Sequence, residues 1–350
     1  MPGADTSLGY NCWSHPDNIM GPETSKKIDR AMQCVLLPSF FFIGAPTNIV
    51  TMVIFYRQGL RDRMNLCLFC LAFVDLLYVT AQFIMISYCF LGTFMPSQVS
   101  FFRWTLLARC LNFIYGSAYV SGCVTMIIAV ERCVCVMFPM KAATLISTKT
   151  MAIILALTFF LLQGMCSVFA FKETILVSRD PVTNGTIVSA TISELYLSHD
   201  IFRIIEDIVL SVVSFLNFVV VVLATIITVA KLQSSVSWRK STTRGRSYLK
   251  GQKVLMRMLV VVSCVYILCT SPNVAMGLTR FTVVEYRSDG KQCNLFLATN
   301  MIGFVITMFN SSTNFFVYIT MSSRFRNELK LLLESDNRKL QHLKIKPIIN

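Results

Sequence analysis

The feature that most constrains this chain is a series of seven long apolar stretches. A helix rises 1.5 Å per residue, so crossing a hydrocarbon layer roughly 30 Å thick takes about 20 apolar residues. All seven stretches are long enough, and they cover residues 34–56, 65–90, 104–138, 150–171, 204–232, 254–278 and 295–321. A soluble protein could also be 55% hydrophobic, but it would have to bury seven such stretches in one core. The sequence therefore predicts an all-α membrane protein with a bundle of seven transmembrane helices.

Basic residues lie mainly in alternate connections between the stretches. Short loops rich in lysine and arginine stay on the cytoplasmic side of a membrane. The connections after stretches one, three and five are basic, and the last of these has eight basic residues and no acid from Lys231 to Arg257. The pattern predicts a multi-pass membrane protein with an extracellular segment 1–31, a transmembrane domain 32–321 and a cytoplasmic segment 322–350.

The net charge of +14 could suggest nucleic-acid binding. However, the basic residues lie beside helix ends, where anionic membrane lipid and a cytoplasmic protein are the natural partners. We therefore exclude nucleic acid as a partner. On the opposite side, the sequon at Asn184 predicts glycosylation, because the charge pattern places it outside the cell.

Several polar side chains fall at similar depth in the apolar stretches, where each needs a partner or a role. They are Asn48, Asp75, Ser121, Asn310, Ser311 and Asn314. A carboxylate among hydroxyl and amide oxygens suits a hard monovalent cation, so Asp75, Ser121, Asn310 and Asn314 are a candidate sodium site. The alternative is a network of interhelical hydrogen bonds around a protonated Asp75. No other cofactor is indicated.

Short motifs occur in a fixed order along the stretches. They are Asn48, Leu71-Ala72-Phe73-Val74-Asp75-Leu76, Glu131-Arg132-Cys133, Pro139, Cys269-Thr270-Ser271-Pro272, Asn310-Ser311-Ser312-Thr313-Asn314-Phe315-Phe316-Val317-Tyr318 and Arg324-Phe325-Arg326. Over residues 38–333 the chain resembles the rhodopsin-like, or class A, G protein-coupled receptors. Within that family it looks most similar to invertebrate peptide receptors and molluscan chemosensory receptors.

The resemblance implies a signal transducer of the plasma membrane and not an enzyme, with a short amphipathic eighth helix at the start of the segment 322–350. Its partners would be an extracellular ligand, a heterotrimeric G protein and an arrestin-type regulator. The residues implied in G protein coupling and activation are Glu131, Arg132, Pro139, Met140, Pro272, Asn314 and Tyr318. Arg132 would be held by Glu131 at rest and turn toward Tyr318 on activation; the alternative is an interfacial arginine that only reaches for lipid headgroups.

The chain departs from the family pattern at several switch positions. Thr270 replaces a tryptophan and Phe315 replaces a proline, so the seventh helix should run straighter, whereas Pro272 keeps the hinge of the sixth. Gln252 stands where an acid often completes the resting lock, so we expect the resting state to be held less firmly.

The family's ligand site lies between the outer halves of helices three, five, six and seven. Candidate lining residues are Asn112, Tyr115, Tyr119, Glu206, Asp207, Asn273, Met276, Arg280, Asn300 and Phe304; the alternative is ordinary helix packing. Ile114 and Met308 stand where amine receptors carry an aspartate and opsins a lysine, which disfavours amines and light. Acidic residues from Glu194 to Asp207 would favour a cationic ligand, unless they are solvated loop charge.

Two further expectations concern cysteines and the class of protein. The family's bridge between helix three and the second outer loop cannot form, since residues 173–203 contain no cysteine. Cys12 with Cys293 is the first alternative pairing and Cys89 with Cys110 the second. A transporter or channel is the alternative function, but it would need internal repeats, broken helices and several buried ionisable groups, and we find one deep acid, Asp75.

Overall fold

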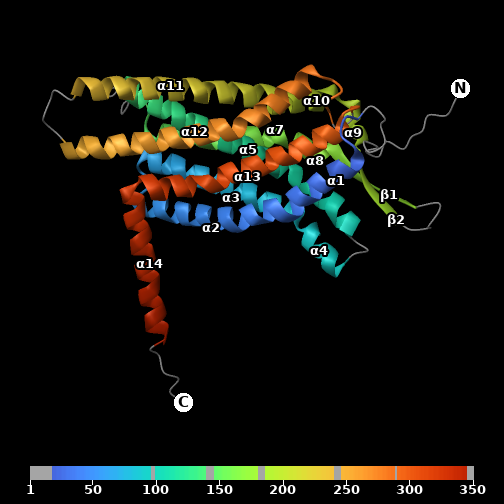
Figure 1. Ribbon diagram of the computed structural model, residues 1–350, viewed down its shortest axis with the longest axis horizontal. Coiled ribbons are helices and arrows are strands. Elements are labelled where there is room, and N and C mark those ends of the chain that lie inside the picture. The colour runs from blue at the N-terminus through green and yellow to red at the C-terminus, as the bar shows by residue number, and fades with distance from the viewer. Residues whose placement is uncertain are drawn as a thin grey trace, which may run out of the picture.

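The computed structural model describes residues 18–95, 99–138, 146–179, 186–239, 246–287 and 290–344. Seven of its helices are long and apolar enough to cross a membrane: Pro22–Gln58, Arg63–Leu91, Phe101–Met137, Thr148–Lys172, Asp200–Gln233, Met256–Thr282 and Cys293–Met321. They run alongside one another in one bundle (Figure 1). The predicted fold class is confirmed.

Several of these spans are divided by local changes in helix geometry. The elements in chain order are α1 Pro22–Ala31, the π-helix η2 Met32–Leu36, α2 Leu37–Gln58, α3 Arg63–Ile86, α4 Tyr88–Phe94, α5 Val99–Met137, α7 Thr148–Cys166, α8 Val168–Lys172, β1 Glu173–Arg179, β2 Thr186–Ile192, α9 Glu194–Ser198, α10 Asp200–Asp207, the π-helix η4 Ile208–Val213, α11 Ser214–Arg239, α12 Arg246–Thr282, α13 Cys293–Met321 and α14 Ser323–Lys344. The antiparallel strands β1 and β2 form a hairpin that pairs Glu173 with Ile192.

The two ends of the bundle carry different elements (Figure 1). The hairpin end carries α1, the β1–β2 hairpin, α9 and α10. The α14 end carries α14, which turns away from the bundle, and the adjacent ends of α11 and α12. Because seven crossings are an odd number, the chain enters the bundle at one end and leaves it at the other, so α1 and α14 lie on opposite sides of a membrane.

The first membrane helix begins well before the predicted boundary. Pro22 occupies the first turn of α1 and Glu23 lies beside it; proline suits a helix start and an acid there interacts favourably with the helix dipole. The helix then continues through η2 into α2. Part of the segment expected to be a separate head is therefore an extension of helix one.

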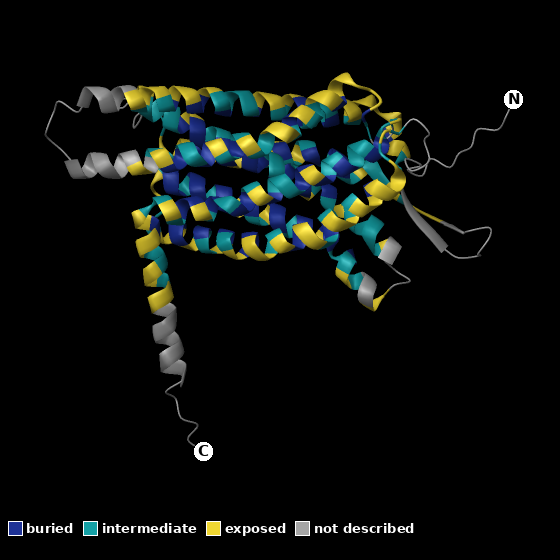
Figure 2. Cartoon of the chain, in the orientation of Figure 1, coloured by how far each residue is buried: buried dark blue, intermediate teal, exposed yellow. Residues whose placement is uncertain are grey.

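Large apolar side chains cover the outside of the bundle. Phe160 and Leu268 are 72% and 73% exposed, and Figure 2 shows exposed residues along the outer surfaces of the helices and buried ones between them. In lipid, such surfaces gain nothing by burial, so close packing and interhelical hydrogen bonds must hold the helices together. Leu71, Val124 and Leu259 belong to the largest buried cluster, which joins α3, α5 and α12.

The disulfide formed by Cys89 at the hairpin end differs from the predicted pairing of Cys89 with Cys110. Cys89 is bonded to Cys34, whereas Cys110 is a free thiol, so the pairing of Cys89 with Cys110 is wrong. It failed because the kink between α3 and α4 turns Cys89 toward helix one. Cys293 is disulfide-bonded, but Cys12 lies outside the described residues, as does Asn184, so both of those predictions stay predictions.

Candidate functional site

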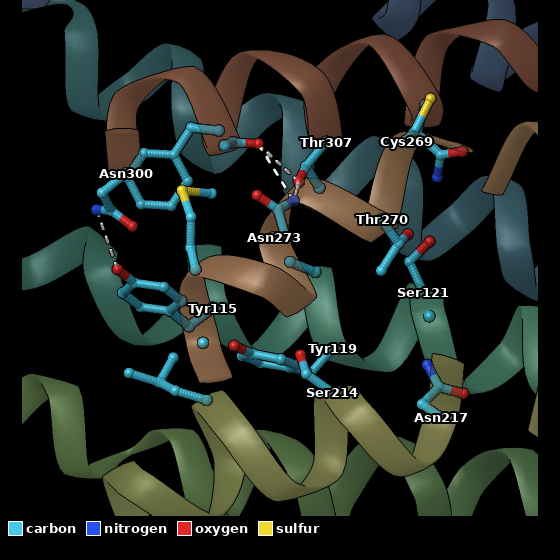
Figure 3. Close-up of a pocket in the computed structure, with 18 of the residues that line it drawn as sticks. Tyr115, Tyr119, Ser121, Ser214, Asn217, Cys269, Thr270, Asn273, Asn300 and Thr307 are labelled. Atoms are coloured by element: carbon cyan, nitrogen blue, oxygen red, sulfur yellow. Dashed lines mark hydrogen bonds between the residues drawn. The ribbon is translucent and has the colours of Figure 1, made fainter. Parts of the chain in front are cut away.

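An inner cavity opens between α5, α11, α12 and α13 in the hairpin half of the bundle. It contains about 1050 Å³ of space unfilled by protein atoms, its open mouth included. Figure 3 shows Tyr115 and Tyr119 of α5 facing Asn273 of α12 and Asn300 of α13 across this space. The wall is mainly aromatic and neutral polar.

Two hydrogen bonds fix the polar part of this wall. Asn273 Nδ2 donates to Thr307 Oγ1 at 2.9 Å, and Asn300 Nδ2 lies 3.4 Å from the Tyr115 hydroxyl oxygen. These contacts join α12 and α5 to α13 (Figure 3). A molecule bound between them would therefore contact three membrane helices at once.

A second, outer cavity lies nearer the hairpin end, against α1. The two cavities share six lining residues: Tyr115, Leu210, Arg280, Phe296, Asn300 and Phe304. The outer wall includes Asp29 and Arg103, which form an ion pair of 2.8 Å between Oδ2 and Nη2. Because Asp29 belongs to α1, the extension of helix one helps to enclose the outer cavity.

Charged side chains from three elements meet beside the two cavities. Glu206 of α10 is 2% exposed; its Oε1 lies 2.7 Å from Lys172 Nζ and 2.6 Å from Arg280 Nη2. The Tyr196 hydroxyl donates to Glu206 Oε2 at 2.5 Å. Burial, followed by the adjacent Glu206 carboxylate, raises the pKa of Tyr196, so this phenol remains a donor. The cluster joins α8, α9, α10 and α12.

The structure brings most of the predicted ligand residues together. Tyr115, Tyr119, Asn273, Met276, Arg280, Asn300 and Phe304 line the inner cavity, and Glu206 lines the outer one. Asn112 and Asp207 line neither: the Asn112 carbonyl accepts a hydrogen bond from Gln163, and Asp207 lies 3.3 Å from Arg280 Nη2. Of the acidic cluster expected to attract a cation, Glu194 and Asp200 are exposed and Glu206 is already paired.

A polar cluster lies deeper in the bundle, at the level predicted for sodium. Asp75 is fully buried; its Oδ1 accepts a hydrogen bond from Ser121 Oγ at 2.6 Å and its Oδ2 one from Asn314 Nδ2 at 2.9 Å. Asn310 and Ser121 both line the floor of the inner cavity. The four residues therefore lie in one region, and oxygen atoms of Asp75 and Ser121 are suitable ligands for a hard cation.

At the α14 end, Glu131 holds two arginines. Its Oε2 lies 2.5 Å from Arg132 Nε, and its Oε1 lies 2.8 Å from Arg63 Nε. Arg63 also donates to the carbonyl of Ile146 at 2.8 Å. The Arg132–Glu131 contact expected for the resting state is present, and Arg63 restrains Glu131 from a second direction.

The other predicted coupling residues lie on α12 and α13 or outside the described residues. Tyr318 is 1% exposed and packs edge-on against Phe55, while its buried hydroxyl has no hydrogen-bond partner among the described residues. Pro272 lies inside α12, and α13 runs without interruption past Phe315. Pro139 and Met140 lie outside the described residues.

Sequence reasoning missed Arg63, Lys172 and Tyr196 as functional candidates. Arg63 and Lys172 lie at the ends of apolar stretches, and Tyr196 lies in the connection between the fourth and fifth stretches, where basic or phenolic side chains are ordinary. The useful signal was the buried acid in each case, because Glu131 and Glu206 required partners. Sequence alone could not say which of the nearby basic residues would supply them.

Comparison with known proteins agrees with this geometry. The model of the family described as 7 transmembrane receptor (rhodopsin family) matches residues 47–318. Proteinase-activated receptor 2 of Bos taurus is 22% identical over 295 residues, which cover 83% of this chain and 69% of the relative. The family match spans all the motifs from Asn48 to Tyr318.

Proposed function

Because the chain belongs to the rhodopsin family of seven-transmembrane receptors, we propose that it is a plasma-membrane receptor that binds an extracellular ligand at the hairpin end and activates a heterotrimeric G protein at the α14 end. Members of this family are signalling proteins and not enzymes, and this chain is a multi-pass membrane protein. The binding of an extracellular ligand and the activation of a G protein are the parts of this proposal that go beyond membership of the family.

One observation carries the proposal: the cavity and the Glu131–Arg132 ion pair occupy opposite halves of the same bundle, and buried polar contacts extend from the cavity to Asn314 of α13. The cavity reaches Ser121 and Asn310, and Ser121 and Asn314 both contact Asp75. Tyr318 follows one turn beyond Asn314 on α13, towards the α14 end. A ligand that shifts α13 or α12 would therefore alter the surroundings of Arg132.

The distribution of charge supports the assignment of the ends. Basic residues predominate in the connections at the α14 end, which is expected for the cytoplasmic side. Anionic lipid and the negatively charged surface of a partner would both be attracted there. The hairpin end, with the paired Glu206 cluster and the cavities, then faces the outside.

Regulation would act on the basic connection between α11 and α12. The hydroxyl residues there are Ser234, Ser235, Ser237, Ser241, Thr242, Thr243 and Ser247. Phosphates on them would offset the basic charge and offer an arrestin-type partner an anionic contact. Phosphate incorporation that maps only to the tail after 322 would contradict this part of the proposal.

The coupling mechanism can be tested without knowing the ligand. In Glu131→Gln, the acid that holds Arg132 is lost, so the resting state should be destabilised and ligand-independent nucleotide exchange should rise. Removing one partner of a buried ion pair such as Glu131–Arg132 costs about 3–5 kcal/mol, so we expect an increase of about tenfold or more. The measurement is the exchange rate of purified heterotrimeric G proteins, one subtype at a time, with the full-length receptor in lipid.

Two further variants complete that experiment. Adding Arg132→Ala to Glu131→Gln should return exchange to the rate without receptor, because the arginine that enters the G protein interface is gone. Lys330→Ala, an exposed basic residue of α14, is the matched control and should leave the increase unchanged. If no G protein subtype responds to Glu131→Gln while the receptor remains folded, the proposed function is wrong.

A further inference from the structure

Arg280 lies at the junction of the two cavities. It is 8% exposed and belongs to the lining of both. The other described residues that line the inner cavity are uncharged. A ligand that reaches from the hairpin end into the inner cavity must therefore pass the guanidinium group.

The guanidinium group of Arg280 has unused hydrogen-bonding capacity. Its Nη2 donates to Glu206 Oε1 at 2.6 Å and lies 3.3 Å from Asp207 Oδ1. Its Nη1 is buried and has no hydrogen-bond partner among the described residues. Leaving a charged donor buried and unpaired is costly, so an acceptor brought by a ligand would stabilise it.

Glu206, the acidic partner of Arg280, is already occupied by protein donors. Glu206 Oε1 accepts hydrogen bonds from both Lys172 and Arg280, and Oε2 accepts one from Tyr196. With 2% of its surface exposed, Glu206 has little room for a ligand cation. Of the two charges in the pair, the arginine is the one that can take a new partner.

The walls around Arg280 indicate what the rest of the ligand resembles. The Tyr115 ring stacks on Phe169 with centroids 4.4 Å apart and lies 5.6 Å from Phe304. The amides of Asn273 and Asn300 are the polar groups next to these rings on the inner side. Such a wall suits an aromatic body with few polar groups.

We propose that the ligand is an aromatic carboxylate, either a small organic acid or a peptide with a free carboxyl terminus, whose carboxylate binds Arg280. A planar guanidinium group matches the two oxygens of a carboxylate, which makes such contacts strong and directional. The inference rests on the proposed function in taking these cavities as the ligand site. It replaces the cationic ligand that the acidic residues alone suggested.

The test compares acids with their amides on the purified full-length receptor. The probes are indole-3-acetate against indole-3-acetamide, and phenylalanyl-phenylalanine with a free against an amidated carboxyl terminus. Binding is followed as the rise in thermal unfolding temperature with probe concentration. The acid of at least one pair should bind about tenfold or more tighter than its amide, and which pair responds distinguishes a small acid from a peptide.

Three variants assign the preference to Arg280. Arg280→Gln should abolish the difference between acid and amide. Since this change leaves Glu206 with fewer partners and could impair folding, Asp207→Asn provides the second arm: it removes the carboxylate 3.3 Å from Arg280 and should make the acid bind more tightly. Lys291→Gln, an exposed lysine of the same end, is the control and should retain the wild-type preference.

The outcomes separate this inference from the proposed function. Equal binding of acid and amide, no binding of either acid, or an unchanged acid affinity in Asp207→Asn would overturn the carboxylate proposal. The unfolding measurement contains no G protein. A selective acid response without any nucleotide exchange would therefore contradict coupling and support the ligand inference. Nucleotide exchange without a selective acid response would support coupling and contradict the ligand inference.

Discussion

Among the described residues, three buried acids differ in how their charge is compensated. Glu131 contacts two arginines and Glu206 contacts a lysine and an arginine. Asp75, which is fully buried, accepts its hydrogen bonds from the neutral groups of Ser121 and Asn314. A buried carboxylate with neutral donors needs a cation or a proton to offset the cost of desolvation. Sodium binding and protonation are thus the two alternatives at Asp75.

We predict that sodium stabilises the resting receptor through Asp75. Replacing N-methylglucamine by sodium at constant ionic strength should raise the unfolding temperature of the wild type, because a ligand bound only by the folded state stabilises it. The shift should disappear in Asp75→Asn and persist in Glu285→Gln, which removes an exposed acid. An identical sodium response in Asp75→Asn, or none in the wild type, would leave the protonated network as the better account.

Residue identity predicted the acids and only some of their partners. Asp75 is predicted as a buried acid because charge in an apolar stretch is costly, whereas Glu131 and Glu206 are candidates only through the resemblance to the receptor family. Arg63 and Lys172 were not predicted as partners, since the rotation of each helix about its axis decides which basic end residue reaches which acid. That rotation follows from packing across the whole bundle, which no short motif records.

At the scale of elements, helix five contains no proline, and a π-turn changes its geometry instead. The π-turn η4 places Ser211 against helix six, where its hydroxyl donates to the carbonyl of Gly277 at 3.0 Å. A Cβ atom on Gly277 would lie 2.9 Å from the carbonyl oxygen of Leu210. Backbone atoms cannot move aside as a flexible side chain can. The absence of a side chain at Gly277 therefore allows α12 to approach η4 this closely.

Gly277→Ala should therefore lower the stability of the receptor although alanine favours helices. Overpacking of this kind costs about 1–3 kcal/mol, against a gain of about 1 kcal/mol from helix propensity, and the unfolding temperature should fall. Gly164→Ala is the matched control: a Cβ atom added to Gly164 would meet no other atom within 4 Å, so that variant should be as stable as the wild type or more. A stability for Gly277→Ala equal to that of Gly164→Ala would contradict the close approach.

The sequence anticipated some elements of the bundle better than others. Each apolar stretch yielded a membrane helix, and the missing proline at Phe315 agrees with an uninterrupted α13. The extension of helix one through Pro22–Ala31 was missed because Lys26, Lys27 and Arg30 make that segment polar. Its helix is stabilised by packing, as where Ser25 Oγ donates to the carbonyl of Asn294 on α13.

At the scale of the whole molecule, the two ends differ in charge and in shape. The hairpin end holds the cavities and the Cys34–Cys89 disulfide, and disulfides form on the oxidising side of a membrane. The α14 end adjoins the basic connections and the tail, which together contain most of the basic residues. Both features support the proposed outward orientation of the hairpin end, and they depend on different chemistry.

This orientation predicts what intact cells will show. Asn184 should carry a glycan, so Asn184→Gln should migrate faster on a gel by the same amount as the enzymatically deglycosylated wild type, because only the outer side is exposed to the glycosylating enzyme. An epitope placed after α14 should bind antibody only once the membrane is permeabilised, since the seven crossings put that end on the opposite side from α1. Antibody binding to the tail epitope in intact cells, with Asn184 unmodified, would reverse the orientation, and it would place the cavity and Arg280 on the cytoplasmic side, where an extracellular ligand could not reach them.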